Sequence, residues 1–408
     1  MKNKLFYGWY IAAAGAGTNF VVLSITLLGF GVFIEAFRVT YGWSVTAIAL
    51  GYSIRTLEVG LFAPFTGYLA DRVGPRRMAV TGVVIIAISL LIFSQATTLP
   101  IYYTASIVMA LGQTIGGPNA FTLAIMRWFV RRRGNAMSIV TTGNAASYVA
   151  TLALTALIAM AGLQGAFLVL SALVFIICVP LALVIKYSPA EMGLRPDGDV
   201  DGPRTADTGK VKKAELSGDF SVRDALRNAN FYLLVLAMAA GAASQLIWVV
   251  FQVPHLVAQG FSLTTVGVLA LTFGLVAIPM RWFVGWLGDT LGRTRTYIAA
   301  VCLMGIGHCF FAFVTPDHWW LFVPFFLIFS VGHAGYLVLN NTLPADFFGS
   351  KNFATIRGLV SALQIPVSVV LPVIMGALYD AQGNYQMAYV GVAVFVILGA
   401  LALVFARR

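Results

Sequence analysis

The chain has 408 residues, of which 60% are hydrophobic and only 10% are charged, and its mean hydropathy is +0.88. Soluble domains carry about 25% charged residues, so most of the surface of this protein must face lipid. The formal net charge of +11 is compatible with nucleic-acid binding, but the basic residues stand in short loops between apolar runs. That arrangement is typical of membrane topology, and we expect no nucleic-acid partner.

A helix that crosses a bilayer needs about 20 apolar residues, and windows of this size occur twelve times along the chain. The first window lacks a small-residue cleavage site, so we expect a retained helix and not a signal peptide. The sequence therefore predicts an all-α membrane protein with twelve transmembrane helices, which span 9–33, 46–70, 77–95, 100–127, 136–160, 165–186, 229–255, 264–288, 294–314, 318–343, 354–378 and 385–406.

One long polar segment, 187–228, separates the sixth window from the seventh and is rich in charged residues, Gly and Pro, as solvated linkers are. Near its end, Ser221 stands three residues before Asp224, which predicts a capped surface helix leading into the seventh window. The expected organisation is a six-helix bundle over 1–186, a linker over 187–228 and a second six-helix bundle over 229–408.

The lysines and arginines give an orientation. When the chain is threaded through twelve helices, nearly all loop cations fall on one side, and only Arg38 falls on the other. Cytoplasmic loops carry the excess of positive charge, so we expect both termini and the linker in the cytoplasm, and the protein in a bacterial inner membrane. Five tryptophans near the ends of the windows are expected to anchor the helices at the membrane interface: Trp9, Trp43, Trp128, Trp319 and Trp320.

The two halves of the chain repeat one another. A Gly-x-x-x-Asp-x-x-Gly-x-x-Arg pattern follows the second window, from Gly67 to Arg77, and the same pattern follows the eighth, from Gly285 to Arg295. A duplication of six-helix halves is typical of transporters whose halves rock about a site near the middle of the membrane.

The loop from Gly67 to Arg77 resembles the cytoplasmic loop motif of the major facilitator superfamily. Within that superfamily the chain is similar to the monocarboxylate porters and to bacterial relatives of the oxalate/formate antiporter. The residues that carry this closer resemblance are Tyr7-Gly8-Trp9, Arg127 to Gly134, Arg281-x-x-x-Gly285, and Leu378-Tyr379-Asp380 with Gly383 and Tyr385. The resemblance covers nearly the whole chain and implies the major facilitator fold.

Arg281 is the strongest candidate for substrate binding. It stands in an apolar window, where an arginine costs roughly 2.5–3.5 kcal/mol on insertion scales, and Pro279 just before it can kink the helix toward a cavity. A guanidinium matches a carboxylate with two parallel hydrogen bonds. A structural ion pair is the alternative interpretation. The resemblance implies the first, because the matching arginine of the porters binds the substrate carboxylate.

Two positions depart from the pattern of the porters. Those proteins carry a proton-relaying lysine where this chain has Leu28, and an aspartate where it has Ala277. The oxalate exchangers add a second cation in the eleventh window, where this chain offers only Arg357, at the cytoplasmic end. A single deep cation favours a monoanion, because a second carboxylate would be buried unpaired.

Proton coupling must therefore use other groups. Arg55 and Glu58 lie three residues apart on one helix face, which indicates either a self-neutralising pair that gates the outer side or a proton carrier at Glu58. His333 stands near the middle of the tenth window with Tyr336 about one turn on, so it is either a packing residue or a group that couples protons or binds substrate. His255 and His308 are interpreted as structural or interfacial.

Asn119 follows Gly116-Gly117-Pro118, which should break the fourth helix and expose backbone to a cavity, where Asn119 would contact substrate. Close helix packing through the glycines is the alternative. Two loop carboxylates and their neighbouring arginines are expected to act with Arg55 in gating: Asp71, Arg72, Arg76, Asp289 and Arg293.

These observations predict a secondary transporter of small monocarboxylates, with Arg281, Asn119, Tyr336, His333 and the apolar Leu28 at the substrate site. An anion exchanger of the oxalate/formate type is the alternative. The chain contains no phosphate loop, no His-Glu-x-x-His and no nucleophile elbow, so we expect no enzyme, and neither a cofactor nor a metal. The expected partners are a monocarboxylate anion, a proton and the lipid bilayer, with the monomer as the working unit.

Overall fold

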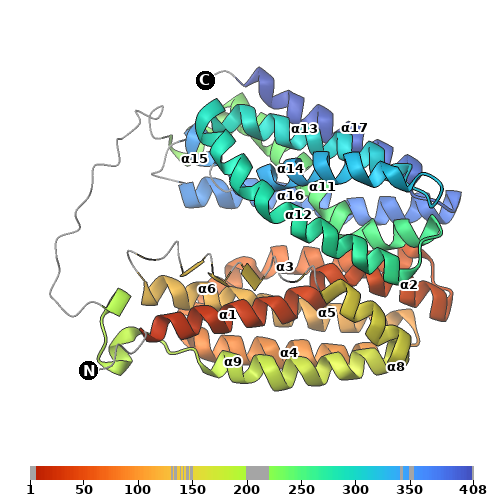
Figure 1. The fold of residues 1–408 in the computed structure, drawn as a ribbon. Helices are drawn as coiled ribbons and strands as arrows, with labels where there is room; N and C mark the ends of the chain where they lie inside the picture. Colours follow the sequence, from red (N-terminus) through yellow and green to blue (C-terminus); the bar gives the residue numbers. More distant parts are fainter. Residues whose placement is uncertain are drawn as a thin grey trace. The chain divides into compact units, whose positions relative to one another are not determined.

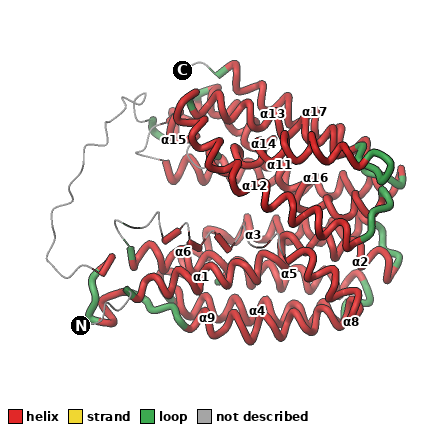
Figure 2. The backbone as a smooth tube through the Cα atoms, viewed as in Figure 1, coloured by secondary structure: helices red, strands yellow, loops and turns green. Residues whose placement is uncertain are grey.

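The computed structural model is built from helices (Figure 2), and no strand occurs among the residues it describes. Nine helices of the described chain are long and apolar enough to cross a membrane. The described residues are 6–129, 132, 136–137, 139–140, 142–143, 147, 150–198, 220–340, 343–348 and 353–406.

The chain divides into two compact units. Unit 1 comprises Met1–Trp43 and Leu50–Thr208, and unit 2 comprises Ser44–Ala49 and Gly209–Arg408. The sequence-predicted limits of the two bundles and the linker stay predictions, since much of the linker lies outside the described residues.

Unit 1 holds the helices of the first half (Figure 1). Two π-helical turns, Ser24–Leu28 and Val174–Cys178, lie between α1 and α2 and between α8 and α9. Gly162 interrupts α8 with a φ of 67°, where the fifth and sixth predicted windows meet. The helices are α1 (Tyr7–Leu23), α2 (Gly29–Tyr41), α3 (Val45–Val73), α4 (Pro75–Ser94), α5 (Leu99–Ile115), α6 (Gly117–Trp128), α8 (Ala150–Leu173) and α9 (Val179–Leu183).

Small residues bring α4, α5 and α6 together. A Cβ atom on Gly82 would lie 2.6 Å from the carbonyl oxygen of Gly112, and one on Gly116 would lie 1.7 Å from the carbonyl oxygen of Met78. Gly116 also stands at the break between α5 and α6, with φ −152° and ψ −17°. The Gly-Gly-Pro segment therefore breaks the helix, and Gly116 at the break lets the backbones approach closely, as small residues do between membrane helices.

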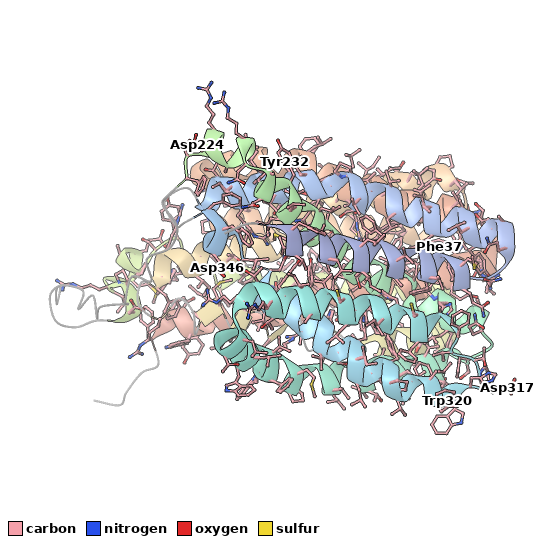
Figure 3. The ribbon with its side chains drawn as sticks, turned by 90° about the horizontal axis from the view of Figure 1, so that it is seen from above. Phe37, Asp224, Tyr232, Asp317, Trp320 and Asp346 are labelled. Carbon is pink, nitrogen blue, oxygen red and sulfur yellow. The ribbon has the colours of Figure 1, made fainter. Side chains whose placement is uncertain are left out.

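Unit 2 follows the same plan. A short helix, α10, begins where the sequence predicts it: the Ser221 hydroxyl accepts a hydrogen bond from the Asp224 amide at 3.2 Å (Figure 3 labels Asp224). The helices are α10 (Val222–Arg227), α11 (Ala229–Ala258), α12 (Leu263–Leu291), α13 (Arg293–Ala312), α14 (Phe322–Leu339), α15 (Leu343–Phe348), α16 (Phe353–Gln382) and α17 (Gln386–Ala402).

Unit 2 also takes in the first turn of α3. The Asp380 carboxylate, near the end of α16, accepts hydrogen bonds from the backbone amides of Val45 and Thr46 at 3.0 and 2.9 Å. A carboxylate at a helix N-terminus satisfies amides that have no partner within the helix and interacts favourably with the helix dipole. Asp380 thus caps the first two amides of α3 from outside the helix, while the Ser44 hydroxyl accepts a hydrogen bond from the Ala47 amide at 3.2 Å.

The internal repeat predicted from the sequence is visible in the packing. In unit 1, α4 packs against α5 and α8, and in unit 2 the equivalent α13 packs against α14 and α17. The glycines of the repeated loop pattern share a backbone conformation: Gly74 precedes α4 with a φ of 83°, and Gly292 precedes α13 with a φ of 90°. Positive φ favours glycine, which explains a glycine in both copies.

The expectation for Trp128 was wrong. Its side chain is fully buried in the core of unit 1, and its indole nitrogen donates a hydrogen bond to the Lys186 carbonyl at 3.0 Å. An indole can be buried once its N–H has an acceptor, so a position near a helix end does not make it an interface anchor. Trp319 and Trp320, by contrast, are 63% and 55% exposed, and Trp320 projects from the ribbon in Figure 3.

Candidate functional site

Arg281 lies past the middle of α12, a continuous helix that begins at a Ser262 cap. Its side chain is half-buried, and its Nε atom is buried without a hydrogen-bond partner among the described residues. An arginine side chain has five N–H donors, so it needs several hydrogen-bond acceptors. A donor without an acceptor inside a membrane-spanning helix is costly, and such a residue is usually paired or functional. No carboxylate whose side chain the structure describes pairs with Arg281 in unit 2, and the choice between a substrate anchor and a structural ion pair stays a prediction.

His333 is fully buried on α14, between the rings of Phe273 and Phe329, whose centroids lie 5.4 and 5.9 Å from its own. Both of its ring nitrogens lack a hydrogen-bond partner in the described structure. A neutral imidazole needs one donor and one acceptor, and leaving both unmet costs about 1–3 kcal/mol for each group. His333 is therefore, besides Arg281, a second buried group of unit 2 whose hydrogen-bonding atoms have no described partner.

Tyr336 lies one turn further along α14 and faces a different neighbour. A Cβ atom on Gly241 would lie 2.5 Å from its ring, so α11 and α14 are in close contact there. Its ring centroid is 6.5 Å from that of Tyr297, whose hydroxyl donates to Asn340 Oδ1 at 3.4 Å. Arg357 interacts electrostatically with both tyrosines.

Arg357 is thus a second cation near the predicted site residues. The sequence suggested only its position at one end of α16, and no periodic signal on α14 links Tyr336 to α16. Whether Arg357 of α16 lies near Tyr336 of α14 depends on how these two helices pack.

His255 and His308 have structural partners, as expected from the sequence. His308 Nε2 lies 2.8 Å from the Ser244 hydroxyl, and His255 Nε2 donates to the Phe311 carbonyl at 2.9 Å. The Tyr389 ring lies beside both imidazoles. These contacts tie α11, α13 and α17 together.

In unit 1 the predicted pairing of Arg55 with Glu58 is not formed. Arg55 is buried with its guanidinium 4.6 Å from the Tyr52 ring centroid and 3.7 Å from the Met109 sulfur. Both carboxyl oxygens of Glu58 are buried without a hydrogen-bond partner among the described residues. Aromatic rings stabilise a desolvated guanidinium, and a spacing of three residues allows an ion pair without requiring one.

The other unit 1 candidates are placed by the helices that carry them. Leu28 is buried and closes the π-helical turn between α1 and α2. Asn119 stands in the first turn of α6, but its side chain lies outside the described residues.

The gating candidates are only partly visible. Arg293 begins α13 and forms an ion pair with Asp346 of α15 at 3.3 Å, and Arg76 is exposed at the start of α4. The side chains of Asp71, Arg72 and Asp289 lie outside the described residues.

Apolar helices of membrane-spanning length, a repeated six-helix plan and an unsatisfied cation within a span define a multi-pass membrane protein of the transporter type. Profile comparison matches residues 11–259 and 233–408 to the Major Facilitator Superfamily, and the chain belongs to this family.

Among curated proteins, the chain is similar to monocarboxylate transporter 12 of Xenopus laevis, with 23% identity over 94% of this chain and 85% of that protein. It is also similar to monocarboxylate transporter 2 of Rattus norvegicus, with 21% identity over 97% and 82% of the two chains. The 2-nitroimidazole transporter of Escherichia coli K12 is 21% identical over 98% and 95%.

Solved structures share the fold. The nucleoside transporter NupG superposes with a TM-score of 0.74 and 13% identity, over 99% of this chain and 100% of that one. A bacterial homologue of the human lysosomal transporter Spinster gives a TM-score of 0.73 with 16% identity, over 98% and 97%.

Proposed function

We propose that this protein is a secondary active transporter of small monocarboxylate anions, of the lactate, pyruvate and acetate class, that carries a proton with each anion. The observation behind the proposal is Arg281: a guanidinium on a spanning helix with an unpaired, buried Nε–H. A carboxylate supplies the missing acceptor and cancels the charge. The similarity to two proteins named monocarboxylate transporters supports the same substrate class.

His333 is the proposed proton carrier. An anion that enters alone works against an inside-negative potential at about 2.3 kcal/mol per 100 mV, whereas an anion and a proton together carry no net charge. His333 is a fully buried ionisable group within a spanning helix, and neither of its ring nitrogens has a hydrogen-bond partner among the described residues. Binding of the anion would offset the repulsion between Arg281 and a protonated His333. Binding of the anion and binding of the proton would therefore each increase the affinity for the other.

Glu58 is the second proposed carrier, since its carboxyl oxygens are buried and unpartnered. Leu28 and Ala277, which stand where the porters have a lysine and an aspartate, cannot carry a proton. If coupling occurs, it must therefore use groups other than those of the porters.

The remaining roles also belong to the proposal. Tyr336 orients the anion, while Asn119 and Leu28 contribute a polar and an apolar contact. Asp71, Arg72, Arg76, Asp289, Arg293 and Arg55 serve in gating. The protein works as a monomer in a bacterial inner membrane with both termini in the cytoplasm, as the distribution of loop cations favours.

A second candidate is an exchanger of the oxalate/formate type. Arg357 favours it, because its electrostatic contact with Tyr336 adds a second positive charge to the neighbourhood of α14. A dianion needs two cations if neither carboxylate is to be buried unpaired.

The test is uptake of radiolabelled L-lactate into proteoliposomes, with and without an imposed inward proton gradient. Wild type is compared with Arg281→Gln and with the control Arg295→Gln. Arg295 is an exposed arginine near the start of α13. We expect the gradient to drive accumulation in wild type and in Arg295→Gln, but not in Arg281→Gln. Undiminished uptake by Arg281→Gln would overturn the assignment.

The exchanger has a different signature. Uptake would be insensitive to the proton gradient and would accelerate several-fold when the vesicles are preloaded with oxalate. That result would replace proton symport by exchange, and loss of uptake in Arg357→Gln would then identify the second cation.

A further inference from the structure

A cavity lies in unit 1, and of the residues proposed above for transport only Arg76, a gating candidate, is in its lining. It has a volume of about 320 Å³, at the junction of α3 with α4 and beside the segment that follows α9. Its lining is Val73, Gly74, Arg76, Arg77, Lys186, Tyr187 and Glu191. We call it the basic pocket. A volume above about 300 Å³ is enough for a small molecule or a headgroup.

The charge of the basic pocket is strongly positive. Arg76, Arg77 and Lys186 line it, and none of them forms an ion pair with a side chain that the structure describes. Glu191 is the single carboxylate of the lining, and it already accepts a hydrogen bond from the Tyr187 amide at 3.2 Å. Three cations face one anion, so the pocket suits an anionic ligand.

Aromatic contacts hold the basic side of the pocket in place. The Arg127 guanidinium lies 4.2 Å from the Tyr187 ring centroid, and the Lys186 ammonium lies 5.9 Å from that of Tyr7. The Lys186 carbonyl accepts the hydrogen bond from Trp128. These contacts position Lys186 and Tyr187 before any ligand binds, which lowers the cost of ordering them.

Apolar side chains are exposed along the helices that lead away from the pocket. On the run that ends in α9, Ile176 and Leu183 are 69% and 46% exposed, and they lie two turns apart on one side of the helix. On α4, which packs beside this run (Figure 1), Ile88 and Leu91 are each 46% exposed. Apolar side chains therefore lead away from the pocket along two adjacent helices.

We propose that the basic pocket binds the phosphate headgroup of an anionic glycerophospholipid, whose acyl chains lie along α4 and α9. The three cations match a phosphodiester, and basic pockets at the ends of membrane helices bind such headgroups. The apolar surface favours a lipid over free phosphate, because only a lipid gains from burying Ile176 and Leu183 under its chains.

The internal repeat supplies a natural comparison. The equivalent cavity of unit 2 has a volume of about 630 Å³ and sits at the start of α13. In the repeated pattern Arg76 corresponds to Thr294, so Arg295 is the only charged residue among the described residues of its lining, and Val404 takes the place of Lys186. The other lining residues are mostly aliphatic: Leu291, Gly292, Ile298, Ala299, Phe347, Leu403, Val404 and Ala406. We therefore expect headgroup binding in unit 1 only.

The experiment is native mass spectrometry of the whole purified protein with phosphatidylglycerol, compared with phosphatidylcholine. A basic residue near an anionic surface contributes roughly a fivefold gain in affinity, so the triple variant Arg76→Gln/Arg77→Gln/Lys186→Gln should bind phosphatidylglycerol about 100-fold more weakly. The single variant Arg295→Gln should bind as wild type does. Equal binding by wild type and the triple variant would overturn the proposal, as would equal affinity for the two lipids.

Two further measurements distinguish a lipid headgroup from free phosphate and test the proposal by a gain of binding, which a misfolded variant would not give. Inorganic phosphate at millimolar concentration should not displace the lipid, and full displacement would identify a free-phosphate site instead. The variant Thr294→Arg/Val404→Lys adds two cations to the cavity of unit 2, and Val404 is 60% exposed, so the lysine can reach water. It should bind a second phosphatidylglycerol, and failure to do so would show that cations beside an apolar face are not sufficient. The outcome is independent of which solute the protein transports.

Discussion

The indole nitrogen of Trp128, at the end of α6, donates a hydrogen bond to the backbone carbonyl of Lys186, 3.0 Å away and 58 residues later in the chain. This bond links the end of α6 to the segment that follows α9. It satisfies a buried donor on one side and fixes the backbone of a pocket-lining lysine on the other. A side chain expected at the lipid interface is therefore part of the core.

Replacing Trp128 by Phe should destabilise the protein. The change removes the donor, leaves the Lys186 carbonyl without it and costs about 1–3 kcal/mol. We expect the midpoint of thermal unfolding in detergent to fall by roughly 2–8 °C, with Trp320→Phe as the exposed control. An unchanged midpoint in Trp128→Phe would mean that water replaces the indole without loss.

Arginine at position 281 should not be replaceable by lysine. Lysine keeps the charge but loses the planar fork that pairs with a carboxylate. Lactate uptake by Arg281→Lys should fall about 10-fold in kcat/KM, and by Arg281→Gln about 100-fold, because hydrogen bonds to charged groups contribute about 1.5–3 kcal/mol. Equal activity of the lysine variant would show that charge alone is recognised.

Proton coupling through His333 predicts a pH dependence. Arg281 on α12 and His308 on α13 are the charged and titratable groups that act on it. The protonated imidazole favours the loaded state, so uptake should rise when the external pH is lowered. In His333→Gln this rise should disappear while exchange persists, whereas His318→Gln, on the exposed surface, should behave as wild type. If uptake by His333→Gln still rises as the external pH is lowered, His333 is not the proton carrier and Glu58 becomes the candidate.

Gly116 should tolerate no side chain. An added Cβ would lie 1.7 Å from the Met78 carbonyl oxygen, so Gly116→Ala must push α4 away from the α5–α6 junction. Overpacking costs typically 1–3 kcal/mol, and we expect a lower unfolding midpoint. Gly358→Ala on α16 is the matched control, since open space surrounds that position and alanine is the better helix former. It should leave the midpoint unchanged or raise it.

Asp380 should matter as an acceptor rather than only as a charge. Asp380→Ala removes the cap from Val45 and Thr46, at about 0.5–2 kcal/mol. Asp380→Asn keeps one acceptor and should lose less. Thermal unfolding of the two variants measures the difference, and the prediction fails if alanine and asparagine are equally well tolerated.

Arg55 and Glu58 illustrate why side-chain partners were harder to predict than helices. Their spacing of three residues places them on one helix face, but the structure turns Arg55 toward Tyr52 and Met109. The choice depends on the rotamer of a long side chain and on the partners available to it: Tyr52 lies on α3 itself, but Phe30 and Met109 are brought to Arg55 by α2 and α5. The local pattern of α3 contains no information about those two partners.

The sequence by itself determined the membrane fold, the order of the helices, the repeat of the two halves and the presence of a cation within a span at Arg281. Each of these depends on local composition and spacing, because lipid forces every long apolar run into a helix. The tertiary structure alone decided that Trp128 is buried, that His333 lies beside Phe273 and Phe329, that Arg357 acts on Tyr336 and that three cations line one pocket. These relationships join residues on different helices, and only the packing of those helices determines which side chains meet.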